Sequence, residues 1–285
     1  MTTELVLKKF ALQIRLGIVE AIASKGGGHI GGSLDLAELL SVLYSDFLRV
    51  DPNRPDWDGR DFLICSKGHA GPALYSVLAL KGFFPYERLS TLNRENTTLP
   101  GHCDRMKVPG IDATTGSLGQ GLSIASGVAL GLHLKKTEQR VFCILGDGEL
   151  AEGQNWEAAQ FAAHHGLDNL IAFLDWNKMQ IDGRNDRVMS LKSPVAKFSA
   201  FGWNSSLVSG GDVLAIQQAV ADALEKKNGQ PSMIVLDTIK GAGVSCVSEL
   251  PNNHCIGFPK ALCDKAIEEL TEQGSYLGME VKKCL

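Results

Sequence analysis

Two polar residues stand after apolar runs of the chain, 177 − 147 = 30 residues apart. Asp147 lies between two glycines after VFCIL, and Asn177 follows LIAFLD and Trp176. The carboxyl ends of successive parallel strands meet at one edge of an α/β sheet, so the two side chains can converge there. A carboxylate, an amide oxygen and a nearby backbone carbonyl suit Mg²⁺ and leave positions open for phosphate oxygens. The pattern predicts a metal-bridged diphosphate site, although Gly-Asp-Gly alone is also a common turn.

Buried strands and amphipathic helices alternate along the chain in an order that would position such a site. The apolar runs at 61–65, 141–145, 170–175 and 232–237 predict strands buried on both faces, as in parallel sheets. Helices are predicted over 4–24, from Ser33 to Tyr44, after Leu118, over 156–166 and over 213–227. The expected fold class is α/β, a doubly wound, mostly parallel sheet with helices on both faces.

The chain shows no composition break that would divide it, so residues 1–285 are predicted to form a single domain. Segment 83–115, which holds Pro85, Pro100 and Pro109, is predicted to be a long irregular loop. Irregular segments of that length in compact domains tend to be either functional or disordered. A helical tail is expected over 260–285.

The composition of the chain bears on whether it binds nucleic acid, crosses a membrane or is secreted. The net charge of −4 and the lack of a basic cluster argue against nucleic-acid binding. No run of about 18 apolar residues predicts a membrane span, and the N-terminus lacks the apolar core of a signal peptide. The seven cysteines include no CxxC pair, and Cys143 sits in an apolar run as a core residue. A reducing, cytoplasmic location is the simplest expectation.

Several short motifs resemble the transketolase family. They are GHIGGS at 28–33, SKGHA at 66–70, PGH at 100–102, TTGSLGQG at 114–121, GDGELAEGQNWEA at 146–158, NKMQIDG at 177–183, and DTIKGAGVS at 237–245 with His254 beyond it. They follow the family's order over residues 10–260, and GDG with the later Asn is the thiamine diphosphate signature. The resemblance implies the thiamine diphosphate-binding fold. It also implies thiamine diphosphate with Mg²⁺, or another divalent cation such as Ca²⁺ or Mn²⁺, as cofactors.

The resemblance further implies a set of ligands. Asp147 and Asn177 would bind the metal through their side chains, and Met179 through its backbone carbonyl. Gly148 would offer its N–H to a diphosphate oxygen at a helix start. The implied cofactor-binding residues are His69, Gly116, Ser117, Leu118, Gly146, Asp147, Gly148, Glu149, Asn177, Ile181, Lys240 and His254. Lys240 would balance diphosphate charge, with a solvated lysine as an equally open alternative.

Two of these residues lie in a turn near the cofactor. By the resemblance, the Gly116 carbonyl accepts from the cofactor's 4′-amino group, and Leu118 packs against the cofactor. Many family members have proline where this chain has Ser117, and proline is common where Ile30 follows His29. The exact shapes of these two loops are therefore left open.

The implied catalytic residues are His29, His102, His254 and Glu152. His29 and His102 resemble residues that contact the donor sugar's hydroxyls. His254 resembles one that lies near the diphosphate and handles substrate protons, a task that suits imidazole near pH 7. Glu152 resembles a glutamate in the proton network that joins two cofactor sites across a dimer; a solvated first-turn glutamate is the alternative. The remaining histidines, His133, His164 and His165, are predicted to be structural.

Length distinguishes this chain from a complete transketolase, which also has a pyrimidine-binding and a C-terminal domain. The chain ends where the first domain would end, so it resembles the N-terminal subunit of a split transketolase. The implied partner is a C-terminal subunit carrying the pyrimidine-binding domain and the glutamate that activates the cofactor. Two copies of each chain would form a heterotetramer. The implied reaction moves a two-carbon ketol unit from a ketose phosphate to an aldose.

Three alternatives remain open at this point. One is an enzyme similar to 1-deoxyxylulose-5-phosphate synthase, against which AEGQNWEA after GDG argues. Another is a subunit of an oxo-acid dehydrogenase, which the series of histidines in glycine-rich loops disfavours. The third is a non-catalytic, cofactor-binding regulatory subunit.

Overall fold

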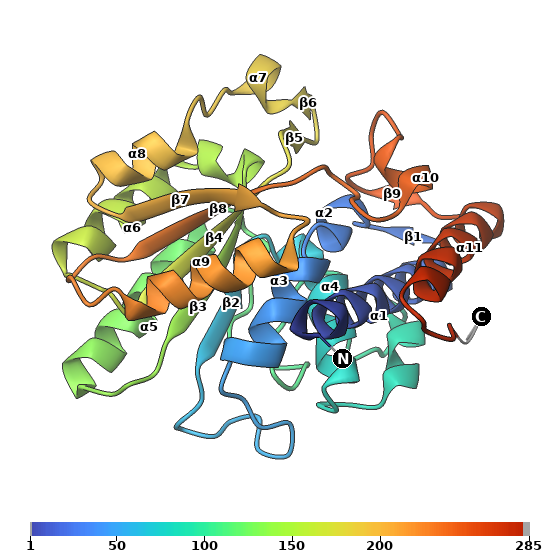
Figure 1. Ribbon diagram of the computed structural model, residues 1–285, viewed down its shortest axis with the longest axis horizontal. Coiled ribbons are helices and arrows are strands. Elements are labelled where there is room, and N and C mark those ends of the chain that lie inside the picture. Colours follow the sequence, from blue (N-terminus) through green and yellow to red (C-terminus); the bar gives the residue numbers. More distant parts are fainter. Residues whose placement is uncertain (1, 282–285) are drawn as a thin grey trace.

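Five parallel strands form the central sheet of the computed structural model, which describes residues 2–281 (Figure 1). Across the sheet they are β2 (Phe62–Cys65), β3 (Val141–Gly146), β4 (Leu170–Trp176), β8 (Ser232–Asp237) and β7 (Asn204–Ser209). Two antiparallel pairs lie outside the sheet: β1 (Gly27–Gly28) with β9 (Ile256–Gly257), and β5 (Met179–Gln180) with β6 (Gly183–Arg184). The predicted fold class is confirmed.

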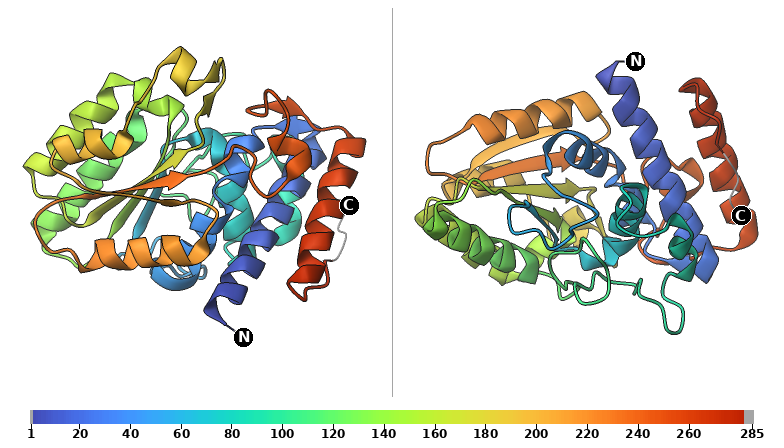
Figure 2. Two further views of the ribbon diagram at one scale, coloured as in Figure 1. Left: turned by 45° about the horizontal axis from the view of Figure 1, so that its top comes forward. Right: turned by 90° about the horizontal axis from the view of Figure 1, so that it is seen from below.

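Helices cover both faces of the sheet (Figures 1 and 2). On one side are α1 (Thr3–Lys25), α3 (Ala37–Val42), α4 (Gly71–Leu80), α9 (Val213–Glu225) and α11 (Lys260–Tyr276). On the other are α5 (Gln120–Lys135), α6 (Gly153–His164) and α8 (Pro194–Ala200). Short helices are α2 (Gly31–Leu34), α7 (Asn185–Val188) and α10 (Ser245–Ser248). None of the helices within the described residues combines the length and hydrophobicity needed to cross a bilayer.

Strand β3 shows why both faces need helices. Phe142 and Ile144 belong to the hydrophobic core on the α1 side, while Val141, Cys143 and Leu145 belong to the core on the α5 side. A strand that is apolar on both faces must be covered twice, as the sequence indicated. Cys143 is fully buried, as predicted.

The structure corrects the predicted elements in a few places. The helix predicted from Ser33 to Tyr44 is wrong in form: it is split into α2, α3 and a π-helical turn over Leu43–Phe47. The Ser33 hydroxyl donates to the His29 carbonyl at 2.7 Å instead of capping a helix. Segment 83–115 contains one 3₁₀ turn, Tyr86–Thr91. Of the predicted tail, α11 forms its first part, and 282–285 lie outside the described residues.

Strand register brings the loops that carry the site to one edge of the sheet. Gly146 of β3 is paired with Asp175 of β4, and Trp176 of β4 with Asp237 of β8. The residues that follow these strands therefore leave the sheet at the same level. This carboxyl edge of the sheet is where ligands bind in open α/β folds.

Candidate active site

The side chain of Asp147 lies against the backbone that follows β4. Its Oδ2 accepts a hydrogen bond from the Lys178 N–H at 2.5 Å, and its Oδ1 accepts from the Gly148 N–H at 2.7 Å. Asp147 is 3% exposed, and none of the ion pairs formed within residues 2–281 includes it. Burial, followed by the charge of Asp175, raises the pKa of Asp147 to about 6. The structure thus brings Asp147 to the segment that starts at Asn177.

The amide of Asn177 is held at both ends. Its Nδ2 donates to Asp35 Oδ2 and to Asp175 Oδ2, both at 2.9 Å. Its Oδ1 accepts from the Met179 N–H at 3.0 Å. Carboxylate oxygens face the amide's NH₂ group and a backbone donor faces its oxygen, so the orientation of the amide follows from its partners. The oxygen keeps a second lone pair for another ligand.

Met179 and Lys240 meet beside this amide. The Lys240 Nζ donates to the Met179 carbonyl at 3.2 Å and lies 3.1 Å from His254 Nδ1. Lys240 is 6% exposed, so the alternative of a solvated lysine is wrong. Burial lowers the pKa of Lys240. A carbonyl has two lone pairs, so Met179 can accept from Lys240 and still offer one to a metal.

These residues fit a divalent cation. One carboxylate, one amide oxygen and one carbonyl are the hard ligands that Mg²⁺ prefers. The buried Oε1 of Gln180, next to Met179, has no hydrogen-bond partner within the described residues. The described residues contain no cluster of three or more His, Cys, Asp or Glu that could hold a metal, so a cation here would rely on amide and carbonyl oxygens as well. A buried carboxylate without a cation and an unpaired amide oxygen are polar groups that a bound ion with its ligand would satisfy.

The four predicted histidines form one cluster. The ring centroid of His29 lies 5.3 Å from that of His69, 5.4 Å from His102 and 5.2 Å from His254. His69 and His254 are 4.8 Å apart. His29 and His102 line a cavity of about 530 Å³, and His254 lines a cavity of about 200 Å³ together with Met179, Ile181 and Lys240. The prediction that these histidines share one site agrees with this geometry.

Burial favours the neutral form of three histidines in this cluster, His29, His69 and His254. Burial, followed by the charge of Lys67, lowers the pKa of His69 to about 2, and burial followed by Lys240 lowers the pKa of His254 to about 4. The pKa of His29 is also lowered, first by burial. A neutral imidazole has one donor and one acceptor nitrogen. These rings can therefore give or take a hydrogen bond from a sugar hydroxyl.

The turn before α5 approaches the histidine cluster closely. Gly116 has a φ of +143°, and a Cβ there would lie 2.9 Å from His102 Cδ2, so glycine is required. Ser117 is exposed and Leu118 is partly buried. Their contacts with a cofactor stay predictions.

The carboxylate of Glu149 connects three loops at the site. It accepts from the Ser66 hydroxyl, from the Gly119 N–H at 2.8 Å and from the Gly146 N–H at 3.0 Å. Glu149 is 2% exposed, and burial raises its pKa. Its carboxylate thus holds glycine-containing loops in place, and a direct contact with the cofactor stays a prediction.

Gly148, Glu152 and Ile181 are three further residues that the sequence places at the site. Gly148 opens a 3₁₀ turn that runs to Ala151, and its N–H is already donated to Asp147. Glu152 is exposed at the start of α6 and makes no capping hydrogen bond there. Ile181, at the turn between β5 and β6, is 63% exposed. The predicted roles of Gly148, Glu152 and Ile181 stay predictions.

Sequence reasoning missed a buried charged network behind Asn177. Lys67, Asp35 and Asp175 are each at most 2% exposed. Lys67 forms an ion pair with Asp175, and the Thr238 hydroxyl donates to Asp175 at 2.5 Å. Burial opposes ionisation of Asp175, but Lys67 keeps its pKa below the usual value; burial, then Asp175, raises the pKa of Asp35. The available signal was charge next to apolar runs, in LDLAELL, SKGHA and LIAFLD.

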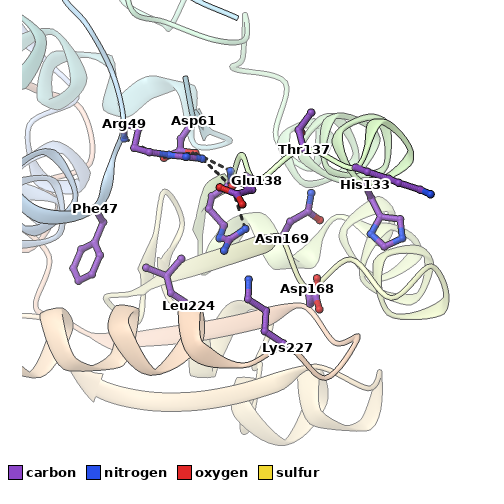
Figure 3. Close-up of a pocket in the computed structure, with 12 residues that line it drawn as sticks. Phe47, Arg49, Asp61, His133, Thr137, Glu138, Asp168, Asn169, Leu224 and Lys227 are labelled. Carbon is purple, nitrogen blue, oxygen red and sulfur yellow. Dashed lines mark hydrogen bonds and ion pairs between the residues drawn. The ribbon is translucent and has the colours of Figure 1, made fainter. Parts of the chain in front are cut away.

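A larger cavity lies away from these residues. Its volume is about 840 Å³, and it lies beside the amino ends of β2, β3 and β4 (Figure 3). Arg49, Asp61, Glu138, Asn169 and Lys227 are among its lining residues. None of the predicted site residues lines it. Size alone therefore does not locate the chemistry of this chain.

Comparison with known proteins shows to which family this chain belongs. The family model for the transketolase thiamine diphosphate-binding domain matches residues 6–283. The chain belongs to the transketolase family. The transketolase subunit for 6-deoxy-6-sulfo-D-fructose from Clostridium sp. (strain MSTE9) is 47% identical to it, over 92% of this chain and 95% of its own. An apulose-4-phosphate transketolase subunit from Phocaeicola vulgatus is 36% identical, over 93% and 94%.

Solved transketolases have the same fold over this region. The Campylobacter jejuni transketolase matches with a TM-score of 0.88 at 29% identity, over 98% of this chain. This chain spans 44% of that protein and 41% of the Pichia stipitis transketolase. The predicted transketolase resemblance and the thiamine diphosphate-binding domain are confirmed. The predicted resemblance to a transketolase subunit is also confirmed, because two similar proteins of nearly equal length are named as transketolase subunits.

Proposed function

We propose that this chain is the N-terminal subunit of a two-chain transketolase that moves a two-carbon ketol unit from a ketose to an aldose. The observation that carries the proposal is the position of Asp147, hydrogen-bonded to the backbone that directly follows Asn177. It occurs in a chain that matches two transketolase subunits over nearly their whole length. Their names place them with transketolases rather than with the synthase or dehydrogenase alternatives.

The proposed cofactors are thiamine diphosphate and a divalent cation, Mg²⁺ or a substitute such as Ca²⁺ or Mn²⁺. Asp147 and Asn177 would hold the cation through side-chain oxygens, and Met179 through its carbonyl. When bound, thiamine diphosphate supplies the nucleophilic carbon that cleaves the bond next to a ketose carbonyl. Lys240, buried beside Met179, would add positive charge near the diphosphate.

The proposed work of the histidines is to bind hydroxyls and move protons. His29 and His102 line the 530 Å³ cavity and would hydrogen-bond the donor sugar. His254, with a pKa lowered to about 4, is neutral at pH 7 and would accept a substrate proton. His69, packed against His254, would hold the diphosphate side of the cluster.

The proposed partner is a C-terminal transketolase subunit, in an assembly of two copies of each chain. The support is that the two similar proteins of nearly equal length are both named as transketolase subunits. Glu152, exposed at the carboxyl edge, is free to join a proton network with another chain. A cytoplasmic location is part of the proposal, because every cysteine within residues 2–281 is free.

The proposed donors are sugars that carry an acidic group. One similar protein is named for a sulfonated fructose and another for phosphorylated apulose. A purified complex of this chain with the product of its neighbouring gene should be assayed with 6-deoxy-6-sulfo-D-fructose, fructose 6-phosphate and apulose 4-phosphate. Transfer that needs both chains, thiamine diphosphate and Mg²⁺ supports the proposal. Full transfer by this chain alone contradicts the split site, and no transfer by a cofactor-loaded complex favours a regulatory subunit.

A further inference from the structure

Asp35 joins three parts of the chain behind the predicted metal site. It follows α2 and is 2% exposed. Its Oδ2 accepts from Asn177 Nδ2 at 2.9 Å, and its Oδ1 accepts from the Gly241 N–H at 2.6 Å. Each oxygen of this one carboxyl group thus receives a hydrogen bond from a different segment.

The two hydrogens of the Asn177 amide are both used on the buried side. One is donated to Asp35 and the other to Asp175, while Asn177 Oδ1 accepts from the Met179 N–H. If the amide were turned by 180°, its oxygen would face two carboxyl groups and its NH₂ would face a backbone donor. The acceptors at the buried side therefore decide which atom of Asn177 points to the site.

The second contact of Asp35 reaches the turn that carries Lys240. Gly241 has a φ of +83°, and a Cβ there would meet Ser248 and Asn253 at 3.1 Å, so this turn has little freedom. Lys240 in turn donates to the Met179 carbonyl. Asp35 thus holds Asn177 and the Lys240–Gly241 turn in a fixed relation, and both contact Met179.

We propose that Asp35 is a positioning residue, which orients the Asn177 amide oxygen toward the metal and fixes the Lys240–Gly241 turn against it. This inference rests on the proposed function, because it assigns Asp35 a task at the metal site of a thiamine diphosphate enzyme. Residues that orient a ligand from behind affect metal affinity without touching the metal.

Asp35→Asn tests the proposal with almost no change in volume. The new amide has one acceptor oxygen, so it can serve Asn177 or Gly241 but not both. Whichever it serves, a buried donor faces the NH₂ group of the new side chain. In the complex with the partner subunit, Mn²⁺ binding in the presence of thiamine diphosphate, followed by electron paramagnetic resonance of free Mn²⁺, should weaken about 10- to 100-fold.

Asp112→Asn is the matched control. Asp112 also accepts a backbone N–H, from Leu63 at 2.8 Å, and pairs with Arg60, and its side chain is 8% exposed. It precedes the turn of Gly116 and lies at the amino edge beside β2. The control should lower thermal stability but leave Mn²⁺ affinity within about two-fold, as expected for a distant, independent site.

The outcomes separate this inference from the function on which it rests. If the complex of the wild-type chain with its partner subunit shows no Mn²⁺ binding with thiamine diphosphate, the proposed function itself is overturned. Wild-type binding with unchanged affinity in Asp35→Asn overturns the positioning role alone, as does an equal loss in Asp112→Asn. If Asp35→Asn does not fold, a crystal structure of wild-type protein with Mn²⁺ and thiamine diphosphate decides. Asn177 Oδ1 on the ion with Nδ2 on Asp35 supports the role, and Nδ2 turned away from Asp35 contradicts it.

Discussion

The two edges of the central sheet both carry buried carboxylates, but they use them differently. At the amino edge, Asp61 accepts from the backbone N–H groups of Arg49 and Arg140 and pairs with the Arg49 guanidinium. At the carboxyl edge, Asp147 accepts from two backbone N–H groups and, within residues 2–281, has no ion pair. Within the part of the chain that the structure describes, Asp61 has a cationic partner and Asp147 has none.

The difference separates a structural site from a binding site. Asp61, paired and hydrogen-bonded, connects the segment before β2 to the start of β3, so its charge is satisfied by folding alone. The pKa of Asp147 is raised to about 6 because burial, followed by the charge of Asp175, outweighs its hydrogen bonds. The larger cavity lies at the edge where Asp61 is paired, and the buried carboxylate with no ion pair within residues 2–281 lies at the other. Buried polar atoms without a partner occur at both edges, Asn169 Oδ1 at the cavity and Gln180 Oε1 beside Met179, so the unpaired charge of Asp147 is the better guide to function here.

Asp147→Ala should have the largest effect at the carboxyl edge. Removing the only carboxylate of the predicted metal set should weaken Mg²⁺-dependent thiamine diphosphate binding about 1,000-fold, or ~4 kcal/mol. Stability should change by less than about 1 kcal/mol, since two lost hydrogen bonds are offset by removal of a buried charge. Titration calorimetry and urea unfolding measure the two quantities. Retained affinity would place the metal elsewhere.

Asp61→Ala should show the reverse pattern. The backbone N–H groups of Arg49 and Arg140 lose their acceptor, so the free energy of unfolding should fall by about 3 kcal/mol. Cofactor affinity of the folded protein should stay within about two-fold of wild type. Urea unfolding with the same calorimetry makes the comparison. A large loss of affinity in this variant would remove the distinction between the two edges.

Acid should weaken the carboxyl edge through its histidines. His69 and His254 have pKa values of about 2 and about 4 in the folded chain, against a reference value of 6.5. Below pH ~6.5 the unfolded state binds more protons, so stability decreases as the pH is lowered, by at most about 1.4 kcal/mol per pH unit for each of these partly buried rings. Urea midpoints between pH 7 and 5 measure this slope. It should be shallower in His69→Gln; an equal slope would mean that His69 is not the cause.

Lys227→Met should have the smallest effect. Lys227 is exposed and lines the 840 Å³ cavity (Figure 3). Neither stability nor cofactor affinity should change by more than about 0.5 kcal/mol, as for an ordinary surface substitution. A loss of ketol transfer in the two-chain complex would show that the amino edge contributes to function after all.

That Asp147 and Asn177 follow neighbouring strands could be predicted from the sequence, because its apolar runs show where these strands end. Apolar runs mark β3 and β4, so the residues directly after them, Asp147 and Asn177, had to share an edge. The same logic missed β7, because NSSLVS has no apolar run and its side chains are only partly buried at the sheet's edge. Hydrophobic patterns in a sequence identify strands that are buried on both faces, but they identify partly exposed edge strands such as β7 poorly.

The residues behind the site were beyond sequence reasoning for a different reason. Asp35 contacts Asn177 across 142 positions, and Lys67 contacts Asp175 across 108. Each looks like a charged residue near an apolar run, and only packing shows that it is buried and paired. Ser33 shows the same limit, since its donation to the His29 carbonyl depends on how α2 turns.

The most direct test of the central claim is a crystal structure with Mn²⁺ and thiamine diphosphate, in which anomalous scattering locates the ion. The account predicts one strong peak at the carboxyl edge, bound by the Asp147 carboxylate, Asn177 Oδ1 and the Met179 carbonyl, with diphosphate oxygens completing the set. A peak bound by other residues, or a diphosphate held without an ion between it and Asp147, would contradict the account.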